Sequence, residues 1–151
     1  WGITDDRVRC ERRGRALRLE EVFAASYILY SSYYDPYEKR ALDIIDTIKE
    51  QIANNPVLIY MKGAPNAPQC GFSARAVQAL MACGEKFAYV DILQNPEIRA
   101  NLPAYANWPT FPQLWVDGEL IGGCDIVSEM AESGELQTLI KASAAANPKE
   151  D

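Results

Sequence analysis

Cys70-Gly71-Phe72-Ser73 follows the apolar run 57–61 after a short loop and begins a stretch with helical periodicity. A thiol at the start of a helix lies near the positive end of the helix dipole and near unpaired backbone N–H groups, which favour the thiolate. Cys70 is therefore a candidate nucleophile or metal ligand. Dithiol redox proteins carry a second cysteine three residues further on, and here that position holds Ser73. The sequence thus provides a reactive thiol without a local resolving partner.

The remaining residues restrict the chemistry further. Cys10, Cys83 and Cys124 form neither a Cys-x-x-Cys pair nor the spacing of a zinc finger. Histidine is absent, which removes His-based zinc sites, histidine haem ligation and Ser–His or Cys–His catalysis. A disulfide framework is not expected in a chain with an adequate core and no secretory signal. We therefore expect a reducing, cytoplasmic location.

The overall charge argues against nucleic acid as the main partner. The net charge is −6, whereas phosphate binding needs a basic face. No apolar run reaches the roughly 18 residues that identify a membrane-spanning helix. We predict that neither nucleic acid nor a membrane is a partner.

Residues 1–41 differ in composition from residues 42–151. They hold eight Lys and Arg against seven Asp and Glu, and five of the eight tyrosines. A transit peptide would be Arg-rich but poor in acids, and these acids also largely cancel the charge that an RNA-binding arm would need. We interpret residues 1–41 as an N-terminal extension with little function of its own and residues 42–151 as the functional domain.

Residues 42–151 alternate between helical and strand patterns. We predict helices at 43–54, 70–83, 95–105, 125–133 and 135–145, and strands at 57–61, 87–92, 113–116 and 119–121. Asp117-Gly118 between the last two strands is a strong hairpin signal. For the helix at 70–83 we predict an inward face made of Phe72, Ala76, Val77, Leu80 and Met81. This order indicates an α/β, thioredoxin-like fold with a four-stranded mixed sheet flanked by helices.

Four motifs occur in a defined order within residues 42–151. They are Met61-Lys62-Gly63, Cys70-Gly71-Phe72-Ser73, Trp108-Pro109-Thr110-Phe111-Pro112-Gln113 and Gly122-Gly123-Cys124-Asp125. With these motifs, residues 42–151 resemble the monothiol glutaredoxins of the CGFS class, of the single-domain bacterial type. Members of that family usually begin near the position of Asp43, so the resemblance leaves residues 1–41 outside the family domain.

The resemblance implies a glutathione site around Cys70. It assigns Lys62 and Arg99 to the glycine carboxylate of glutathione, and an amine at the end of a strand suits that role as a point charge. It assigns Thr110, Phe111 and Pro112 to a loop with a cis proline, whose exposed backbone pairs with an extended peptide. Taken alone, Lys62 and Arg99 are ordinary surface charges, and Pro112 marks a tight entry into a strand.

The glycine pair Gly122-Gly123 allows a ligand to approach the backbone closely, and the next helix begins at Cys124-Asp125. Backbone N–H groups at Gly123 and Cys124 suit the γ-glutamyl carboxylate. Asp125 either accepts a hydrogen bond from the ammonium group of glutathione or serves only as an N-cap. The resemblance also includes Phe72 among the glutathione contacts.

The other sulfur and indole groups receive structural roles. We interpret Cys124 as a backbone contact, with a disulfide to Cys70 under oxidation as an alternative, and Cys83 as a small buried hydrophobe. Trp108 and Trp115 are interpreted as packing residues of the core or of the proline loop.

A [2Fe–2S] cluster generally needs four thiolate-like ligands, and this chain offers one plausible exposed thiolate. The resemblance implies a homodimer that binds one cluster through Cys70 of each chain and two glutathione thiols. It also associates the stretch 64–69, longer than the loop of dithiol relatives, with cluster binding. The predicted function is a carrier that transfers the cluster to acceptor proteins, because half of its ligands are small exchangeable molecules.

Two other functions remain open. In the first, Cys70 is the sole nucleophile of a glutathione-dependent thiol–disulfide oxidoreductase that removes glutathione from proteins. The CGFS class is typically poor at that reaction, so it ranks second. In the other, the protein is an adaptor whose Cys70 face meets partners such as BolA-type proteins, which is compatible with the carrier.

Overall fold

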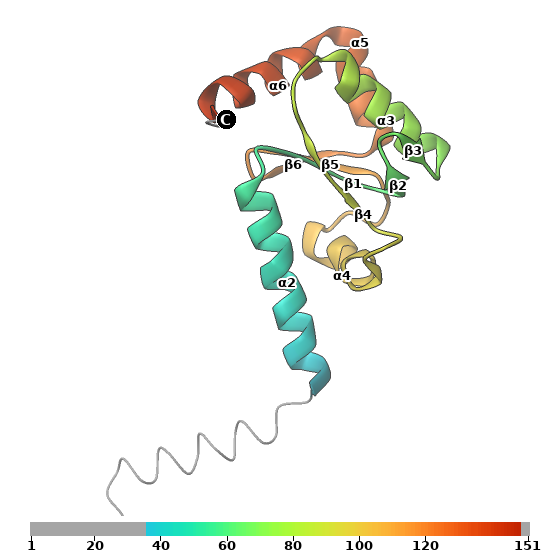
Figure 1. The fold of residues 1–151 in the computed structure, drawn as a ribbon, viewed down its shortest axis with the longest axis vertical. Helices are drawn as coiled ribbons and strands as arrows, with labels where there is room; N and C mark the ends of the chain where they lie inside the picture. Colours follow the sequence, from blue (N-terminus) through green and yellow to red (C-terminus); the bar gives the residue numbers. More distant parts are fainter. Residues whose placement is uncertain (1–35, 149–151) are drawn as a thin grey trace, which may run out of the picture. The chain divides into compact units, whose positions relative to one another are not determined.

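A buried central strand organises the computed structural model, which describes residues 36–148 (Figure 1). All five residues of β1, Val57–Met61, are buried. The strand pairs in parallel with β4, Ala88–Asp91, and antiparallel with β5, Gln113–Val116. β6, Glu119–Gly122, pairs with β5, so the sheet order is β4-β1-β5-β6. The predicted four-stranded mixed sheet is confirmed, whereas the expectations for residues 1–35, including Cys10, lie outside the described residues.

Helices cover both faces of this sheet because alternate residues of β1 point to opposite sides. Val57, Ile59 and Met61 pack against α3 (Gly71–Ala82), α5 (Cys124–Ser133) and α6 (Glu135–Ala146). Leu58 and Tyr60 pack against α2 (Pro36–Asn54) and α4 (Pro96–Ala106). None of these described helices is both long and apolar enough to cross a membrane.

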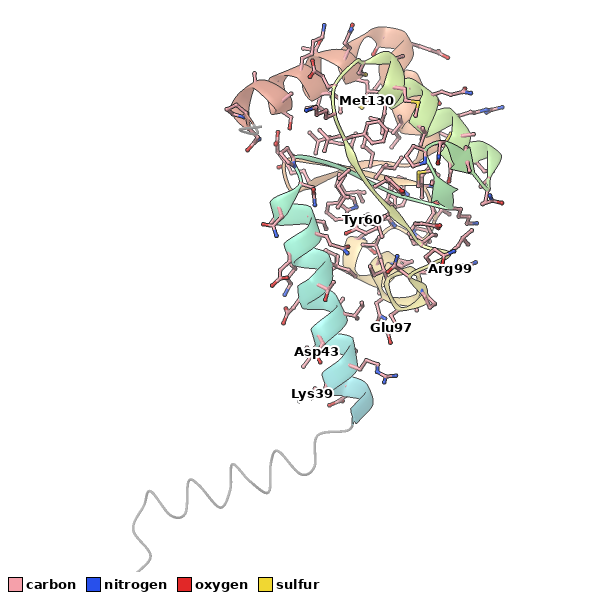
Figure 2. The ribbon with its side chains drawn as sticks, viewed as in Figure 1. Lys39, Asp43, Tyr60, Glu97, Arg99 and Met130 are labelled. Atoms are coloured by element: carbon pink, nitrogen blue, oxygen red, sulfur yellow. The ribbon has the colours of Figure 1, made fainter. Side chains whose placement is uncertain are left out.

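Two buried or turn-forming polar groups are satisfied within the fold. The hydroxyl of Tyr60 (Figure 2) donates a hydrogen bond to Oε1 of Gln51 at 3.0 Å, and burial raises the pKa of this phenol. Asp117 and Gly118 both have positive φ, as the predicted two-residue hairpin turn requires. Oδ1 of Asp117 accepts hydrogen bonds from the Ser143 hydroxyl at 2.8 Å and the Asn147 side-chain amide at 3.0 Å. These bonds attach the end of α6 to the turn.

Helix α2 begins at Pro36 rather than at the predicted Asp43. The apolar periodicity starts only at Ile44, but proline at the first helical position and Glu38 in the first turn are independent start signals. In this earlier part of the helix, Nε of Arg40 lies 3.9 Å from Oε1 of Glu97 in α4. Residues 36–41, placed in the extension above, are thus part of α2, and the division of the chain after residue 41 stays a prediction.

The predicted inward face of α3 is wrong at Phe72 and Met81. These side chains are 55% and 52% exposed, and the buried residues of the helix are Ser73, Ala76, Val77 and Leu80. The buried set follows the i, i+3, i+4, i+7 spacing of one helical face. Because serine is polar, the hydrophobic pattern assigns Ser73 to the solvent side. It then places the larger apolar residues Phe72 and Met81 on the inward face.

A small hairpin over residues 63–68 covers most of the stretch 64–69; in it, β2 (Gly63–Ala64) pairs with β3 (Ala67–Pro68). Gly63 begins it with φ of +89°, a conformation that disfavours residues with a Cβ. A Cβ at this position would lie 2.6 Å from the carbonyl oxygen of Ala67 and 2.8 Å from the backbone nitrogen of Gln69. The hairpin therefore requires glycine at position 63.

We predict that Gly63→Ala lowers the free energy of unfolding by more than about 2 kcal/mol, because a left-handed backbone conformation costs an L-residue about 1–2 kcal/mol before any overlap is counted. Gly71→Ala is the matched control, since no atom lies within 4 Å of a Cβ built there. Urea denaturation followed by circular dichroism measures both. Equal stability of the two variants would contradict this account of the hairpin.

Candidate functional site

The predicted site residues meet in one cleft at the carboxyl end of β1. The cleft has a volume of about 680 Å³. All but one of the predicted residues line it: Lys62, Cys70, Phe72, Arg99, Thr110, Phe111, Gly123, Cys124 and Asp125. The remaining residue, Pro112, is buried and follows a cis peptide bond. The cleft thus joins the end of β1, the start of α3, helix α4, the proline loop and the start of α5.

Cys70 is half-buried and occupies the N-cap position of α3, in an extended conformation. The backbone N–H groups of Ser73 and Phe72, in the first turn of the helix, hold the pKa of the thiol below its ordinary value. Partial burial opposes this shift, while the charge of Lys62 and the hydroxyl of Ser73 add to it. The helix start therefore favours the thiolate, as the sequence predicts.

Ser73 occupies the place where a dithiol protein carries its second cysteine, and it is fully buried. Its Oγ accepts a hydrogen bond from the backbone N–H of Lys62 at 3.2 Å. The same hydroxyl helps to lower the pKa of the Cys70 thiol. Ser73 thus connects the thiolate to the end of β1 through a group that cannot form a disulfide.

The chain bends at Lys62 and Gly63, and three segments hold this bend. The N–H of Lys62 donates to Ser73, as described above, and the backbone carbonyl of Lys62 accepts from the N–H of Gln69 at 2.9 Å. The N–H of Gly63 donates to Oδ1 of Asp91 at 3.0 Å. The bend positions the half-buried Lys62 side chain in the cleft beside Cys70.

A second cation and a helix start face the same cleft. Arg99 is exposed on α4 (Figure 2). The N-cap residue of α5 is Gly123, whose conformation is extended and which makes no side-chain capping bond. Such a helix start leaves backbone N–H groups for an anionic ligand. Asp125 lies inside the first turn of α5, so the alternative in which it serves as the N-cap is wrong.

The proline loop is held from beneath by a buried amide. The side chain of Gln113 is fully buried and donates to the carbonyl oxygens of Trp108 at 3.0 Å and Thr110 at 3.3 Å. Trp108 also lines the cleft, and its buried Nε1 has no partner among the described residues. Trp115 packs in the core below, with its ring 6.2 Å from that of Tyr105.

Four lining residues were not among the predicted site residues: Pro103, Trp108, Pro109 and Ile126. Trp108 and Pro109 belong to a quoted motif, which was the available signal. Ile126 directly follows the predicted Asp125. Pro103 lies one helical turn beyond Arg99 and has no local signal that points to the cleft.

Two of the three cysteines in the described range are buried. Cys83 is 7% exposed, its thiol donates to the carbonyl of Ala79 at 3.3 Å, and burial raises its pKa. This confirms its predicted structural role. Cys124 is also 7% exposed, with Sγ 3.9 Å from the Oγ of Ser128. Both are free thiols, as is Cys70, which is the most accessible of the three.

The chain is similar to known proteins in sequence and in fold. Residues 57–121 match the family model described as Glutaredoxin. The chain is 72% identical over 107 residues to Glutaredoxin 4 of Escherichia coli (strain K12), which covers 71% of this chain and 93% of that protein. Reduced poplar apo GrxS14 superposes with a TM-score of 0.59 at 42% identity, over 68% of this chain and 94% of that one. A buckwheat glutaredoxin–glutathione complex reaches 0.64 at 23% identity, over 73% and 98%, and shows the shared fold.

We predict that Ser73→Ala raises the pKa of Cys70, because the variant loses a hydroxyl that lowers this pKa and the acceptor for the Lys62 N–H. The pKa should stay below that of an ordinary cysteine, since the two backbone donors remain. The pH dependence of Cys70 alkylation, read from the modified peptide by mass spectrometry, measures the midpoint. Ser128→Ala, next to Cys124, is the control. An unchanged midpoint in Ser73→Ala would contradict the assigned role.

Proposed function

This chain belongs to the glutaredoxin family, and on that premise we propose that it is a monothiol glutaredoxin that binds glutathione in the cleft and carries a [2Fe–2S] cluster to acceptor proteins. The observation that carries the proposal is the single half-exposed thiol, Cys70, stabilised as a thiolate beside Ser73 and facing two cations and a helix start. We further propose that residues 42–151 hold this function and that it operates in the reducing cytoplasm.

The chemistry of the cleft matches the two ends of glutathione. Glutathione carries a carboxylate at its glycine end, and a carboxylate and an ammonium group at its γ-glutamyl end. Lys62 and Arg99 provide positive charge for the glycine carboxylate. The N-terminus of α5 provides backbone donors for the γ-glutamyl carboxylate, and Asp125 provides an acceptor for the ammonium group. The backbone of the loop 110–112 then receives the central cysteine, with its sulfur toward Cys70.

The cluster is cargo that two chains and two glutathione molecules hold together. A cluster of this type takes four ligands, which are thiolates in most proteins. Cys70 provides one thiolate from each chain, and the thiol of each bound glutathione provides another. The hydroxyl of Ser73 supports Cys70 without competing as a thiolate ligand. Because half of the ligands leave with glutathione, the cluster is released when an acceptor protein, alone or with a BolA-type partner, offers better ligands.

The alternative function uses the same thiolate as a nucleophile. Cys70 attacks the glutathione sulfur of a glutathionylated protein, which releases the protein thiolate and forms a disulfide between Cys70 and glutathione. A second glutathione thiolate then attacks that glutathione sulfur, which yields oxidised glutathione and regenerates Cys70. The lowered pKa of Cys70 favours this reaction as well as cluster binding, so experiment must separate the two.

We predict that Lys62→Gln weakens glutathione binding about tenfold, which corresponds to the loss of one charge-assisted hydrogen bond. Arg99→Gln should weaken it by no more than about fivefold, because the guanidinium group is exposed and solvent screens its charge. Isothermal titration calorimetry measures both. Arg75→Gln is the control, since Arg75 is exposed on α3 and is not among the residues that line the cleft. Unchanged affinity in the Lys62 variant would contradict the assigned carboxylate site.

We predict that anaerobic reconstitution with iron, sulfide and glutathione yields a coloured dimer, and that Cys70→Ser abolishes the visible absorption. Omission of glutathione should have the same effect, because it removes half of the ligands. Cys83→Ala should load normally, since this thiol is buried in the core. A colourless monomer with rapid glutathione-dependent disulfide reduction would overturn the carrier and favour the oxidoreductase.

A further inference from the structure

Asp91 lies next to the point where the chain leaves β1. It is the last residue of β4 and pairs with Met61, the last residue of β1. The N–H of Ile92 continues this pairing to the carbonyl of Met61 at 3.0 Å. Asp91 itself is not among the residues that line the cleft, so any effect on a ligand passes through its neighbours.

One oxygen of the Asp91 carboxylate accepts hydrogen bonds from two separate segments. Oδ1 accepts from the N–H of Gly63 at 3.0 Å and from the N–H of Leu93 at 2.8 Å. Gly63 directly follows Lys62, the first cation of the cleft. Leu93 lies in the turn that leads to α4, and this helix carries Arg99, the second cation of the cleft. The bond to Gly63 spans 28 residues of sequence, so the carboxylate connects parts of the chain that local structure does not join.

The backbone of Asp91 extends this connection to the start of α4. Its carbonyl accepts from Nδ2 of Asn95 at 2.8 Å, and Asn95 is the N-cap residue of that helix. The carbonyl of Asn95 in turn accepts from the N–H of Arg99 at 3.0 Å. A continuous set of hydrogen bonds therefore runs from Gly63 through Asp91 and Asn95 to the backbone of Arg99.

We propose that Asp91 is a positioning residue that sets the spacing between Lys62 and Arg99, and thereby the fit of the glutathione carboxylate between them. The inference rests on the proposed glutathione site. Ser73 and Gln69 fix Lys62 relative to α3 and the small hairpin, whereas Asp91 fixes it relative to α4. A charged acceptor holds its donors more strongly than a neutral one, and both donors here are backbone groups with little freedom of their own.

Three substitutions separate the effect of the acceptor oxygen from that of its charge. Asp91→Ala removes the acceptor that Gly63 and Leu93 share, and glutathione affinity should fall about tenfold. Asp91→Asn keeps an oxygen in the same place, so its affinity should stay within about threefold of the natural protein. Asp91→Glu keeps the charge but displaces the oxygens by one methylene group, and its affinity should fall nearly as far as that of the alanine variant.

Two readouts distinguish positioning from general destabilisation. In the Asp91→Ala background, Lys62→Gln should weaken binding less than it does in the natural protein, because the cation is already displaced. Amide hydrogen exchange should accelerate at Gly63 and Leu93. Asp117→Ala is the matched control, because it removes a carboxylate oxygen that also accepts two hydrogen bonds, at the other end of the central strand. It should lower stability and leave glutathione affinity unchanged.

Calorimetric titration with glutathione decides between the outcomes. If the natural protein binds glutathione and the Asp91→Ala and Asp91→Glu variants bind it with the same affinity as the natural protein, the positioning role is overturned while the proposed function stands. Loss of affinity in Asp91→Asn as large as in Asp91→Ala also overturns it. If Asp91→Ala does not fold, the comparison of Asp91→Glu with Asp91→Asn decides alone. Failure of the natural protein to bind glutathione overturns the proposed function, and the positioning role with it.

Discussion

The bend at Lys62 and Gly63 is the constraint on which the rest of the site depends. The buried strand β1 ends at Met61, and the next residue must leave the sheet and place a cation beside Cys70. Backbone hydrogen bonds to Ser73, Gln69 and Asp91 fix this exit from three directions. Because these partners belong to α3, the hairpin and β4, the positions of the thiolate and of α4 are set by the same few bonds.

Ser73 shows how one substitution changes both geometry and chemistry. A thiol at this position would resolve a mixed disulfide within the chain. The hydroxyl cannot, yet it is a stronger hydrogen-bonding group than a thiol; it accepts from the N–H of Lys62 and helps to lower the pKa of Cys70. In the proposed function the second thiol comes from glutathione, and the cleft provides charges and backbone donors that suit this ligand. The absence of a second cysteine at position 73 is thus linked to the proposed glutathione site beside Cys70.

Much of this structure follows from local patterns in the sequence, and the remainder depends on contacts through space. Strand β1 and the Asp117-Gly118 hairpin have short-range signals, and the ordered motifs place nearly all of the cleft residues. The exposed Phe72 and the buried Ser73 reverse the hydrophobic pattern, because a hydrogen bond to Lys62 outweighs the preference of serine for solvent. Asp91 has no signal at all, since its two donors become neighbours only after β4 pairs with β1.

In the proposed function, glutathione is a ligand of the [2Fe–2S] cluster rather than only a reductant. Native mass spectrometry of the anaerobically loaded protein tests this most directly, because it counts chains, cluster and glutathione in one species. We expect a mass equal to two chains, one [2Fe–2S] cluster and two glutathione molecules, with glutathione lost together with the cluster. A cluster-bearing species without glutathione, or a cluster held by a single chain, would contradict it.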